Sequence, residues 1–347
     1  MTYPTRALGM QWTPARPRVL VVACSDGRLQ EATDAFLASA LDIHRYDRLY
    51  VPGGGGALSS GRGEFVRSHE FRRECRFLVD AHHVDHLVLL FRNQDIDDHQ
   101  LLAAAGIYGP PHEAASRKYH LNAGQQIDDK FMISQHPSVS IISNLDENGN
   151  PVIDNGGLGS YEVVWHTDNS YVEMPPAGSM LYALIVPVNG GGDTSFNNQY
   201  LACEELPEEL RRAIEGRSQV HDSSRNSAGV LRPGVKLPTK PEEVQGPTHP
   251  MVRVHPVTKK RALYLGRRRV WPSNYIVGLP NEESEALLDK LWAHATQPKY
   301  AWTHQWRVGD IVLWDNRCCM HYRTEVDHTQ ARVMHRTTIK GEPLIAP

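Results

Sequence analysis

Two side chains that could share one metal ion lie close together in the stretch Trp165-His166-Thr167-Asp168. Side chains alternate along an extended strand, so a histidine and an aspartate two positions apart face the same side. A third candidate ligand, His321, follows far downstream. Two imidazoles and one carboxylate are the facial ligand set that holds a ferrous ion and leaves three coordination positions open. The residue types therefore predict that His166, Asp168 and His321 bind one metal ion, although the first pair alone is also typical of a hydrogen-bonded loop.

The composition is typical of a globular protein and argues against two classes of partner. The chain has 347 residues, 40% of them hydrophobic, and a formal net charge of -3. This length suits one large domain with an extra segment, or two domains. The small negative charge argues against nucleic-acid binding, and no apolar run reaches the roughly 20 residues that a membrane span needs. The N-terminus shows no signal-peptide pattern, so a cytoplasmic protein is expected.

The cysteine pattern indicates reduced thiols rather than a disulfide framework. The five cysteines are an odd number, and no two of them form a Cys-x-x-Cys motif. Such usage is typical of a reducing compartment. Cys318 and Cys319 come shortly before His321, so they could approach the metal ion, but packing in the core is their expected role.

Strands and helices alternate in the first part of the chain. Val19 to Cys24 is a continuous apolar run, as in a buried parallel strand. Further strands are expected at 49–51 and 85–91, with helices at about 30–41 and 64–82 between them. This alternation indicates a parallel βαβ arrangement.

The segment at about 18–91 resembles the β-type carbonic anhydrases and their bacterial relatives. The resemblance rests on Cys24-Ser25-Asp26-Gly27-Arg28 and on Val51-Pro52-Gly53-Gly54. In that family the cysteine binds zinc, and the Asp-Arg pair orders the metal-bound water. The His-x-x-Cys motif that should complete the site is absent after Phe91, and one thiolate cannot hold an ion that needs four ligands. We therefore interpret the segment as a remnant or a structural graft, with zinc-dependent carbonic anhydrase activity as an alternative.

Beyond Phe91 the pattern changes to short strands separated by turn residues. Ile96 to Leu102 indicates the start of a helix, with Asp97 or Asp98 as its cap. Longer helices are expected at about 207–215 and 281–296. Strands are expected at 138–142, 179–186, 192–196, 251–255, 262–265, 310–314 and 332–339. Many short strands at such spacing indicate an antiparallel sandwich or barrel, and hence a mixed α and β protein.

The sequence from about Val88 to Pro347 resembles the taurine dioxygenase-like (TauD/TfdA) family of iron(II)- and 2-oxoglutarate-dependent oxygenases. Four blocks match the family in order: Phe91-Arg92-Asn93-Gln94, then Trp165-His166-Thr167-Asp168 with Pro175-Pro176-Ala177-Gly178, then Gly191-Gly192-Asp193-Thr194, and finally Trp314-Asp315-Asn316-Arg317 through His321 to Arg336. The resemblance implies a double-stranded β-helix, or jelly roll, with flanking helices at 92–347. The small βαβ segment at 1–91 would precede it.

The resemblance also implies roles for individual residues at the centre. His166, Asp168 and His321 match the iron ligands of the family. Arg332 matches the arginine that pairs with the distal carboxylate of 2-oxoglutarate, for which a planar guanidinium offers a two-pronged fit. Thr194 matches a hydroxyl donor to the same carboxylate.

Two further residues are candidates for binding the prime substrate. Arg336 lies four residues after Arg332, and in the family an arginine there often holds the acidic group of the substrate. In one strand this even spacing keeps both arginines on the same face. The alternative role for Arg336 is a surface salt bridge. Asn169, the second candidate, directly follows the metal pair.

The implied reaction uses ferrous iron, 2-oxoglutarate and dioxygen to hydroxylate a small acidic substrate, with release of succinate and carbon dioxide. Glu162 stands where the taurine enzyme has an asparagine, which argues against taurine itself. Alkylsulfonates, aryloxyalkanoates and modified amino acids all remain open as substrates. A non-catalytic metal-binding barrel is the alternative function. A homo-oligomer without nucleic-acid or membrane partners is expected.

Overall fold

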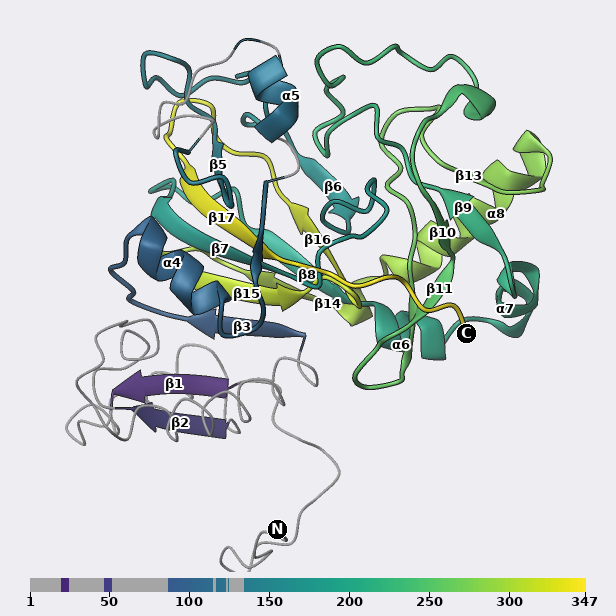
Figure 1. Ribbon diagram of the computed structural model, residues 1–347, viewed down its shortest axis with the longest axis horizontal. Helices are drawn as coiled ribbons and strands as arrows, with labels where there is room; N and C mark the ends of the chain where they lie inside the picture. The colour runs from purple at the N-terminus through teal and green to yellow at the C-terminus, as the bar shows by residue number, and fades with distance from the viewer. Residues whose placement is uncertain (1–19, 25–46, 52–86, 115–116, 123, 125–133) are drawn as a thin grey trace, which may run out of the picture.

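The structure is a computed structural model that describes residues 20–24, 47–51, 87–114, 117–122, 124 and 134–347 (Figure 1). The expected helices at 30–41 and 64–82 lie outside the described residues. So do Ser25 to Arg28 and Pro52 to Gly54 of the carbonic-anhydrase-like motifs.

Two large antiparallel sheets form the body of the described structure, and the larger has six strands. Its strand order is β3-β15-β7-β17-β4, and β5 also pairs with β17. The strands are β3 (Val88–Phe91), β4 (Pro111–His112), β5 (Val139–Ser143), β7 (Gly178–Ile185), β15 (Ile311–Asp315) and β17 (Val333–Ile339). β3 lies at one edge, so the strand expected just before residue 92 belongs to this sheet (Figure 1).

The smaller sheet has four antiparallel strands in the order β14-β8-β16-β6. The strands are β6 (Val163–His166), β8 (Thr194–Asn198), β14 (Ala301–His304) and β16 (Cys319–Arg323). Apolar side chains of both sheets form one buried cluster, to which Leu181 and Trp314 contribute from the larger sheet and Phe196 from the smaller. The ring centroids of Phe196 and Trp314 are 5.4 Å apart. The two sheets therefore pack against each other through a shared core.

Helix α4 (Asp98–Ala105) covers the other face of the larger sheet (Figure 1). Its Leu101 packs in one cluster with Met180 and Leu313, while the neighbouring residues of those strands face the smaller sheet. Strand alternation thus gives the central strands two apolar faces. Asp97 accepts from the backbone N–H of Gln100 at 2.8 Å, and the Gln100 side chain accepts from the backbone N–H of Asp97 at 2.9 Å. This capping box confirms the predicted helix start.

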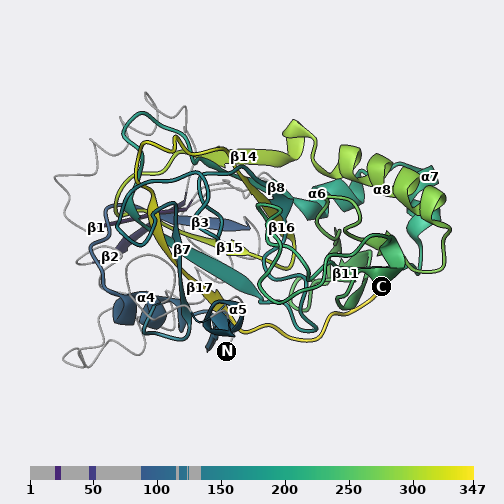
Figure 2. The same cartoon turned by 90° about the horizontal axis from the view of Figure 1, so that it is seen from above.

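Helices and short strands gather at one end of the two sheets (Figure 2). The α-helices are α6 (Gln199–Glu204), α7 (Glu208–Ile214) and α8 (Asn281–Ala295), with α5 (Arg117–Asn122) elsewhere. The strands are β9 (Ser218–Val220), β10 (Thr248–Pro250), β11 (Val252–Val254), β12 (Arg261–Leu263) and β13 (Tyr275–Ile276), and the 3-10 turns are η2 (Pro241–Glu243) and η3 (Pro298–Tyr300). Leu288 and Leu291 of α8 are fully buried, which confirms its predicted apolar face.

The first two strands form a separate parallel pair. β1 (Leu20–Cys24) and β2 (Asp47–Val51) lie side by side in the same direction, as the βαβ prediction requires (Figure 1). Within the described residues, no helix combines the length and apolarity needed to cross a membrane.

Most expected strands are present, with small shifts at their ends. The strand expected at 192–196 begins only at Thr194, as β8. Gly190, Gly191 and Gly192 have φ values of 79°, 90° and 68°, which belong to a turn and not to a strand. The predicted mixture of α and β structure is confirmed.

Candidate metal centre

Two neighbouring strands of the smaller sheet bring the candidate histidines together. β6 and β16 pair antiparallel, and His321 lies directly opposite His166 in their register. The two ring centroids are 4.1 Å apart. Asp168 comes two residues after β6 ends and lies in a turn. Strand alternation therefore applies only as far as His166. The turn after β6 brings the Asp168 carboxylate close to the two imidazoles.

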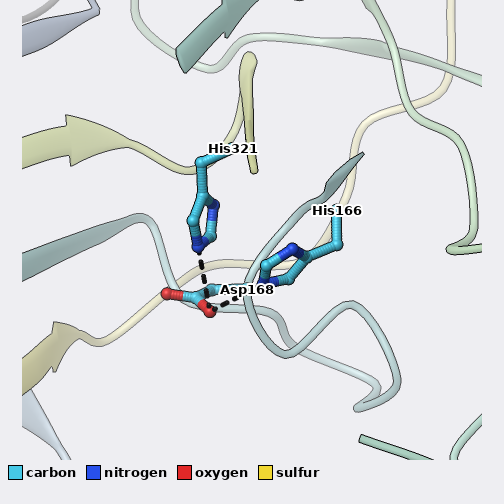
Figure 3. A group of neighbouring side chains, drawn as sticks. All are labelled: His166, Asp168 and His321. Atoms are coloured by element: carbon cyan, nitrogen blue, oxygen red, sulfur yellow. Dashed lines mark ion pairs between the residues drawn. The ribbon is translucent and has the colours of Figure 1, made fainter. Parts of the chain in front are cut away.

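The three side chains point toward one another (Figure 3). Asp168 Oδ1 lies 3.7 Å from His166 Nε2 and 3.8 Å from His321 Nε2. Both distances are too long for a hydrogen bond, yet a shared ion with bonds of about 2 Å to each ligand spans them. The residues His166, Asp168 and His321 are 6%, 2% and 8% exposed. The predicted residues thus form one buried group whose geometry fits a metal ion.

The tautomer of His166 follows from a hydrogen bond on the far side of its ring. Nδ1 lies 2.7 Å from the carbonyl oxygen of Val164, which can only accept, so Nδ1 carries the proton. Nε2 then presents its lone pair to the centre, as a metal ligand must. The ring of His321 lies against Trp314 at a centroid distance of 4.8 Å. No described residue bonds to the buried Nδ1 of His321.

Asn316 and Ser179, to which the sequence motifs assigned no role, hold Asp168 in place. The backbone N–H of Asp168 donates to Asn316 Oδ1 at 2.8 Å, and Asn316 Nδ2 donates to the Asp168 carbonyl at 2.9 Å. Ser179 Oγ donates to Asp168 Oδ2 at 2.7 Å. Asn316 belongs to a block that resembles the family, but only the fold shows which loop it supports.

The electrostatics favour an ionised carboxylate beside a neutral imidazole. Burial alone would raise the pKa of Asp168, but Arg336 and the two histidines hold that pKa well below its usual range. Arg336 Nη1 donates to Asp168 Oδ1 at 2.8 Å. Burial and the neighbouring His166 lower the pKa of His321 to about 3. At neutral pH these two groups therefore have the protonation states that bind metal ions.

Arg332 and Thr194 are both buried and both have a donor to offer. Arg332 is 2% exposed, and no described residue bonds to its Nε. Burial holds the pKa of Arg332 well below its usual range. A Cβ on Gly192 would lie 2.8 Å from Arg332 Nε, so glycine is required beside the guanidinium. Thr194 Oγ1 accepts from Trp306 Nε1 at 2.9 Å, which leaves the hydroxyl proton of Thr194 to donate. A buried cation with an unused donor fits an anionic ligand.

Arg332 and Arg336 both lie on the side of the smaller sheet, as their even spacing predicts, whereas His335 between them contacts Asp98 of α4 on the opposite face. β17 begins at Val333, and its register against β7 shifts between Val333 and Met334. The extra residue of that shift belongs to β7, while the pairing with β5 is regular along β17 and continues to Arg332, whose carbonyl accepts from the Asn144 N–H. Arg332 lies beside Gly192, whereas Arg336 reaches Asp168.

A pocket lies beside the candidate metal ligands. Asn169, Tyr171 and Arg336 line it, together with His166, Asp168, residues of β5 and two loops. Asn169 has a φ of 50°, a left-handed conformation that asparagine tolerates, and its Oδ1 accepts from the Tyr171 hydroxyl at 3.0 Å. Both residues predicted to bind substrate thus face this pocket, and the ion pair of Arg336 is formed with buried Asp168 and not at the surface.

A second buried group consists of His255, Asp315 and Cys318, whose ligand atoms lie within 4.8 Å of one another. His255 Nε2 is 3.0 Å from Asp315 Oδ2, and Arg317 donates to both oxygens of Asp315, at 2.9 and 2.7 Å. His255 Nδ1 accepts from two backbone N–H groups. Burial raises the pKa of Cys318 well above its usual range, so its thiol stays protonated. Cys318 packs in the core, as expected.

A family model for "Taurine catabolism dioxygenase TauD, TfdA family" matches residues 64–338. The match covers most of the chain and begins inside the segment at 18–91. The comparisons with known proteins give no support to the likeness of that segment to carbonic anhydrases.

Two relatives with known activities span most of the chain. This chain is 30% identical over 264 residues to the alpha-ketoglutarate-dependent 2,4-dichlorophenoxyacetate dioxygenase of Burkholderia sp. (strain RASC). The match covers 73% of this chain and 82% of the relative. It is also 31% identical over 281 residues to the alpha-ketoglutarate-dependent sulfate ester dioxygenase of Pseudomonas putida. This match covers 76% of the chain and 80% of the relative.

Solved structures give the same result. AAD-2 in complex with Mn(II) and N-oxalylglycine matches with a TM-score of 0.61 and 28% identity, covering 78% of this chain and 90% of that one. A taurine dioxygenase from Burkholderia xenovorans matches with a TM-score of 0.58 and 30% identity, covering 79% and 84%.

These relatives confirm the predicted enzyme class, a 2-oxoglutarate-dependent dioxygenase that uses ferrous iron and dioxygen. The buried His-Asp-His group provides a site suited to the metal ion. The chain belongs to the TauD, TfdA family of dioxygenases.

Proposed function

We propose that this enzyme hydroxylates a small organic acid beside a metal ion held by His166, Asp168 and His321. One observation carries the proposal: His166 and Asp168 of this group line a pocket in which Asp168 is the only carboxylate among the described lining residues, while three arginines line it. Such a pocket favours an anionic substrate. The names of relatives specify 2,4-dichlorophenoxyacetate, (S)-phenoxypropionate and sulfate esters, all of which are anions at neutral pH.

Ferrous iron is the metal ion that we assign to this group. With dioxygen as the oxidant, bound iron would supply the chemistry that converts 2-oxoglutarate to succinate and carbon dioxide and hydroxylates a C–H bond of the substrate. The protein's own contribution is to fix the ligands. The carbonyl of Val164 orients His166, while Asn316 and Ser179 orient Asp168.

The distal carboxylate of 2-oxoglutarate is assigned to Arg332 and Thr194. The buried guanidinium of Arg332 has an unused Nε, and the Thr194 hydroxyl has a proton to donate. Both features support an acidic ligand, because a buried cation is stabilised by a paired anion. Gly192 leaves the space that Arg332 needs.

The acidic substrate is assigned to the pocket lined by Arg336 and Asn169. Arg336 uses Nη1 for Asp168, and its buried Nε has no partner among the described residues, so further donors are available. Asn169 is tied to Tyr171 and forms part of the wall. Phenoxyalkanoates, alkylsulfonates, sulfate esters and amino-acid-like acids are the candidate substrates.

We also propose a fold for each of the two parts of the chain. The two packed sheets support a double-stranded β-helix at 92–347, to which β3 adds an edge strand. The parallel β1–β2 pair supports a separate βαβ segment within 1–91. The cytoplasmic location and the homo-oligomer stay predictions.

Succinate release tests the proposal. The enzyme is supplied with iron(II), 2-oxoglutarate and one of four acids: 2,4-dichlorophenoxyacetate, (S)-2-phenoxypropionate, taurine or hexyl sulfate. At least one acid should raise the succinate rate several-fold and be hydroxylated. The Asp168→Ala variant should lose this rate, whereas Arg212→Gln, which alters only an exposed ion pair with Glu208, should keep it. Iron binding without succinate from any acid would instead indicate a non-catalytic metal-binding barrel.

A further inference from the structure

Arginine side chains gather in the pocket beside the candidate metal centre. Arg117, Arg232 and Arg336 all line it. Arg117 and Arg232 are 9% and 8% exposed, and the guanidinium of Arg117 donates to the carbonyl of Ser134. Arg336 is committed in part to Asp168. Arg232 is thus a buried cation of the pocket to which neither the sequence motifs nor the proposed function assigns a role.

Arg232 lies over an aromatic ring that the protein holds in a fixed position. Its guanidinium carbon is 4.1 Å from the ring centroid of Tyr171. The Tyr171 hydroxyl donates to Asn169 Oδ1. His249 Nε2 lies 3.0 and 3.1 Å from the carbonyl oxygens on either side of Tyr171, those of Ser170 and Val172. A guanidinium stacked on such a ring keeps its N–H donors in its own plane, where they can meet an oxyanion.

Another buried arginine lies close to Arg232. Arg267 is 9% exposed, and it donates to Ser227 Oγ at 3.1 Å and to the Arg225 carbonyl at 2.6 Å. Burial and the nearby charge of Arg232 lower the pKa of Arg267 to about 10, although Asp222 opposes the shift. Two close cations in a poorly solvated region repel each other. An anion in the pocket would reduce that repulsion.

We propose that Arg232, stacked on Tyr171, binds the anionic group of the substrate together with Arg336 and determines the preference of the enzyme for acids. The inference rests on the proposed function of this pocket. The ligand class is an organic oxyanion, namely a carboxylate, sulfonate or sulfate, because a guanidinium pairs with each through two parallel N–H donors. Arg232 belongs to the loop between β9 and β10, so this loop is the part of the chain that contributes specificity.

The test compares charged and uncharged substrates of the same shape. The probe is the acid from the four-member panel with the highest succinate yield, paired with its uncharged amide, sulfonamide or sulfamate. kcat and KM are measured for both compounds with the wild type, Arg232→Gln, Arg232→Lys and the exposed control Arg212→Gln. Arg232→Gln should raise the KM for the acid about 10- to 100-fold and reduce the preference for the acid over the uncharged analogue by a similar factor. Arg232→Lys should restore part of the preference, and Arg212→Gln should match the wild type.

The outcomes separate this inference from the proposed function. Turnover of an acid with an unchanged acid preference in Arg232→Gln would overturn the role of Arg232 and leave the function standing. An equal rise in KM for the acid and for its uncharged analogue would also overturn it, because that result indicates a purely structural role. Succinate from none of the four acids would overturn the proposed function, and this inference with it.

Discussion

In the described part of the chain, two of the buried groups of histidine and aspartate differ in whether the imidazole lone pairs are already used. In the first group, Asp168 Oδ1 stands 3.7 and 3.8 Å from two imidazole Nε2 atoms. In the second, His255 Nε2 contacts Asp315 at 3.0 Å, and the other ring nitrogen accepts from the backbone. The first group can take up an ion between its members, whereas the second is closed by its own hydrogen bonds.

The difference shows that burial and residue type do not by themselves make a metal site. Burial opposes the charge of Arg317, yet the adjacent Asp315 raises its pKa above the usual range, as expected of a permanent ion pair. That closed network contributes to stability. The open group leaves a carboxylate and two imidazole lone pairs for a ligand, so the two groups should respond differently to substitution.

The largest expected effect concerns the stability contributed by the closed group. His255→Ala removes the buried partner of Asp315 and the acceptor of two part-buried backbone N–H groups. It should lower the free energy of unfolding by about 3 kcal/mol or more. His166→Ala, measured on the metal-free protein, should cost less than half as much, because His166 Nε2 makes no hydrogen bond within the group. Urea denaturation of both variants gives the comparison, and equal losses would remove the distinction.

The open group should depend on the hydrogen bonds that hold Asp168. Asn316→Ala removes the acceptor of the Asp168 N–H, so it should weaken iron(II) binding about 10- to 100-fold. Asn197 is an equally buried control that donates to the carbonyl of Ala295 at 2.8 Å. Asn197→Ala should lower stability but not iron affinity in a competition assay with a coloured chelator. Similar affinity losses in both variants would mean that Asn316 acts only through general stability.

A smaller effect is expected where the chain leaves space for Arg332. Gly192→Ala would place a methyl group 2.8 Å from Arg332 Nε and should raise the KM for 2-oxoglutarate about 10-fold. Gly190 is the matched control, since it has a similar φ of 79° and nothing within 4 Å of an added Cβ. Gly190→Ala should therefore share the backbone strain but keep the KM. If both variants shift the KM alike, turn strain and not the displaced guanidinium is responsible.

The smallest effect concerns a buried histidine that belongs to neither group. His221 is 1% exposed, no described residue bonds to either ring nitrogen, and burial holds its pKa well below the usual range. The unfolded chain binds a proton at this residue below about pH 6.5 while the folded protein does not, so stability is retained above that pH and falls as the pH decreases. The slope is at most about 1.4 kcal/mol per pH unit for this group.

The variant His221→Phe should flatten this dependence. It keeps an aromatic ring to stack on Tyr264, whose centroid lies 5.3 Å away, but it has no proton to bind. The difference in melting temperature between pH 7.5 and 5.5 should be smaller than in the wild type. An identical difference would show that His221 does not titrate on unfolding as described.

The candidate ligands could be predicted from the sequence because their chemistry depends on residue type and local spacing. The helix cap at Asp97 could be predicted for the same reason, since its partner Gln100 is three residues away. The register that places His321 opposite His166 could not, because it depends on the pairing of distant strands.

The residues that support the site could not be predicted from the sequence, for a related reason. Asn316 and Arg232 act across long separations in the chain, and their partners at Asp168 and Tyr171 are set by packing and not by a motif. The register shift near Val333 likewise follows from pairing with β7, although it leaves Arg332 and Arg336 on the same side of the sheet.

Anaerobic titration with iron(II) and 2-oxoglutarate tests the central claim most directly, because the chelate of the two gives a weak visible charge-transfer band. The wild type should develop this band at a stoichiometry of about one iron per chain. His166→Ala, which removes one of the three proposed ligands, should not develop it at the same concentrations. A band of unchanged intensity in His166→Ala would contradict the assignment of the metal centre.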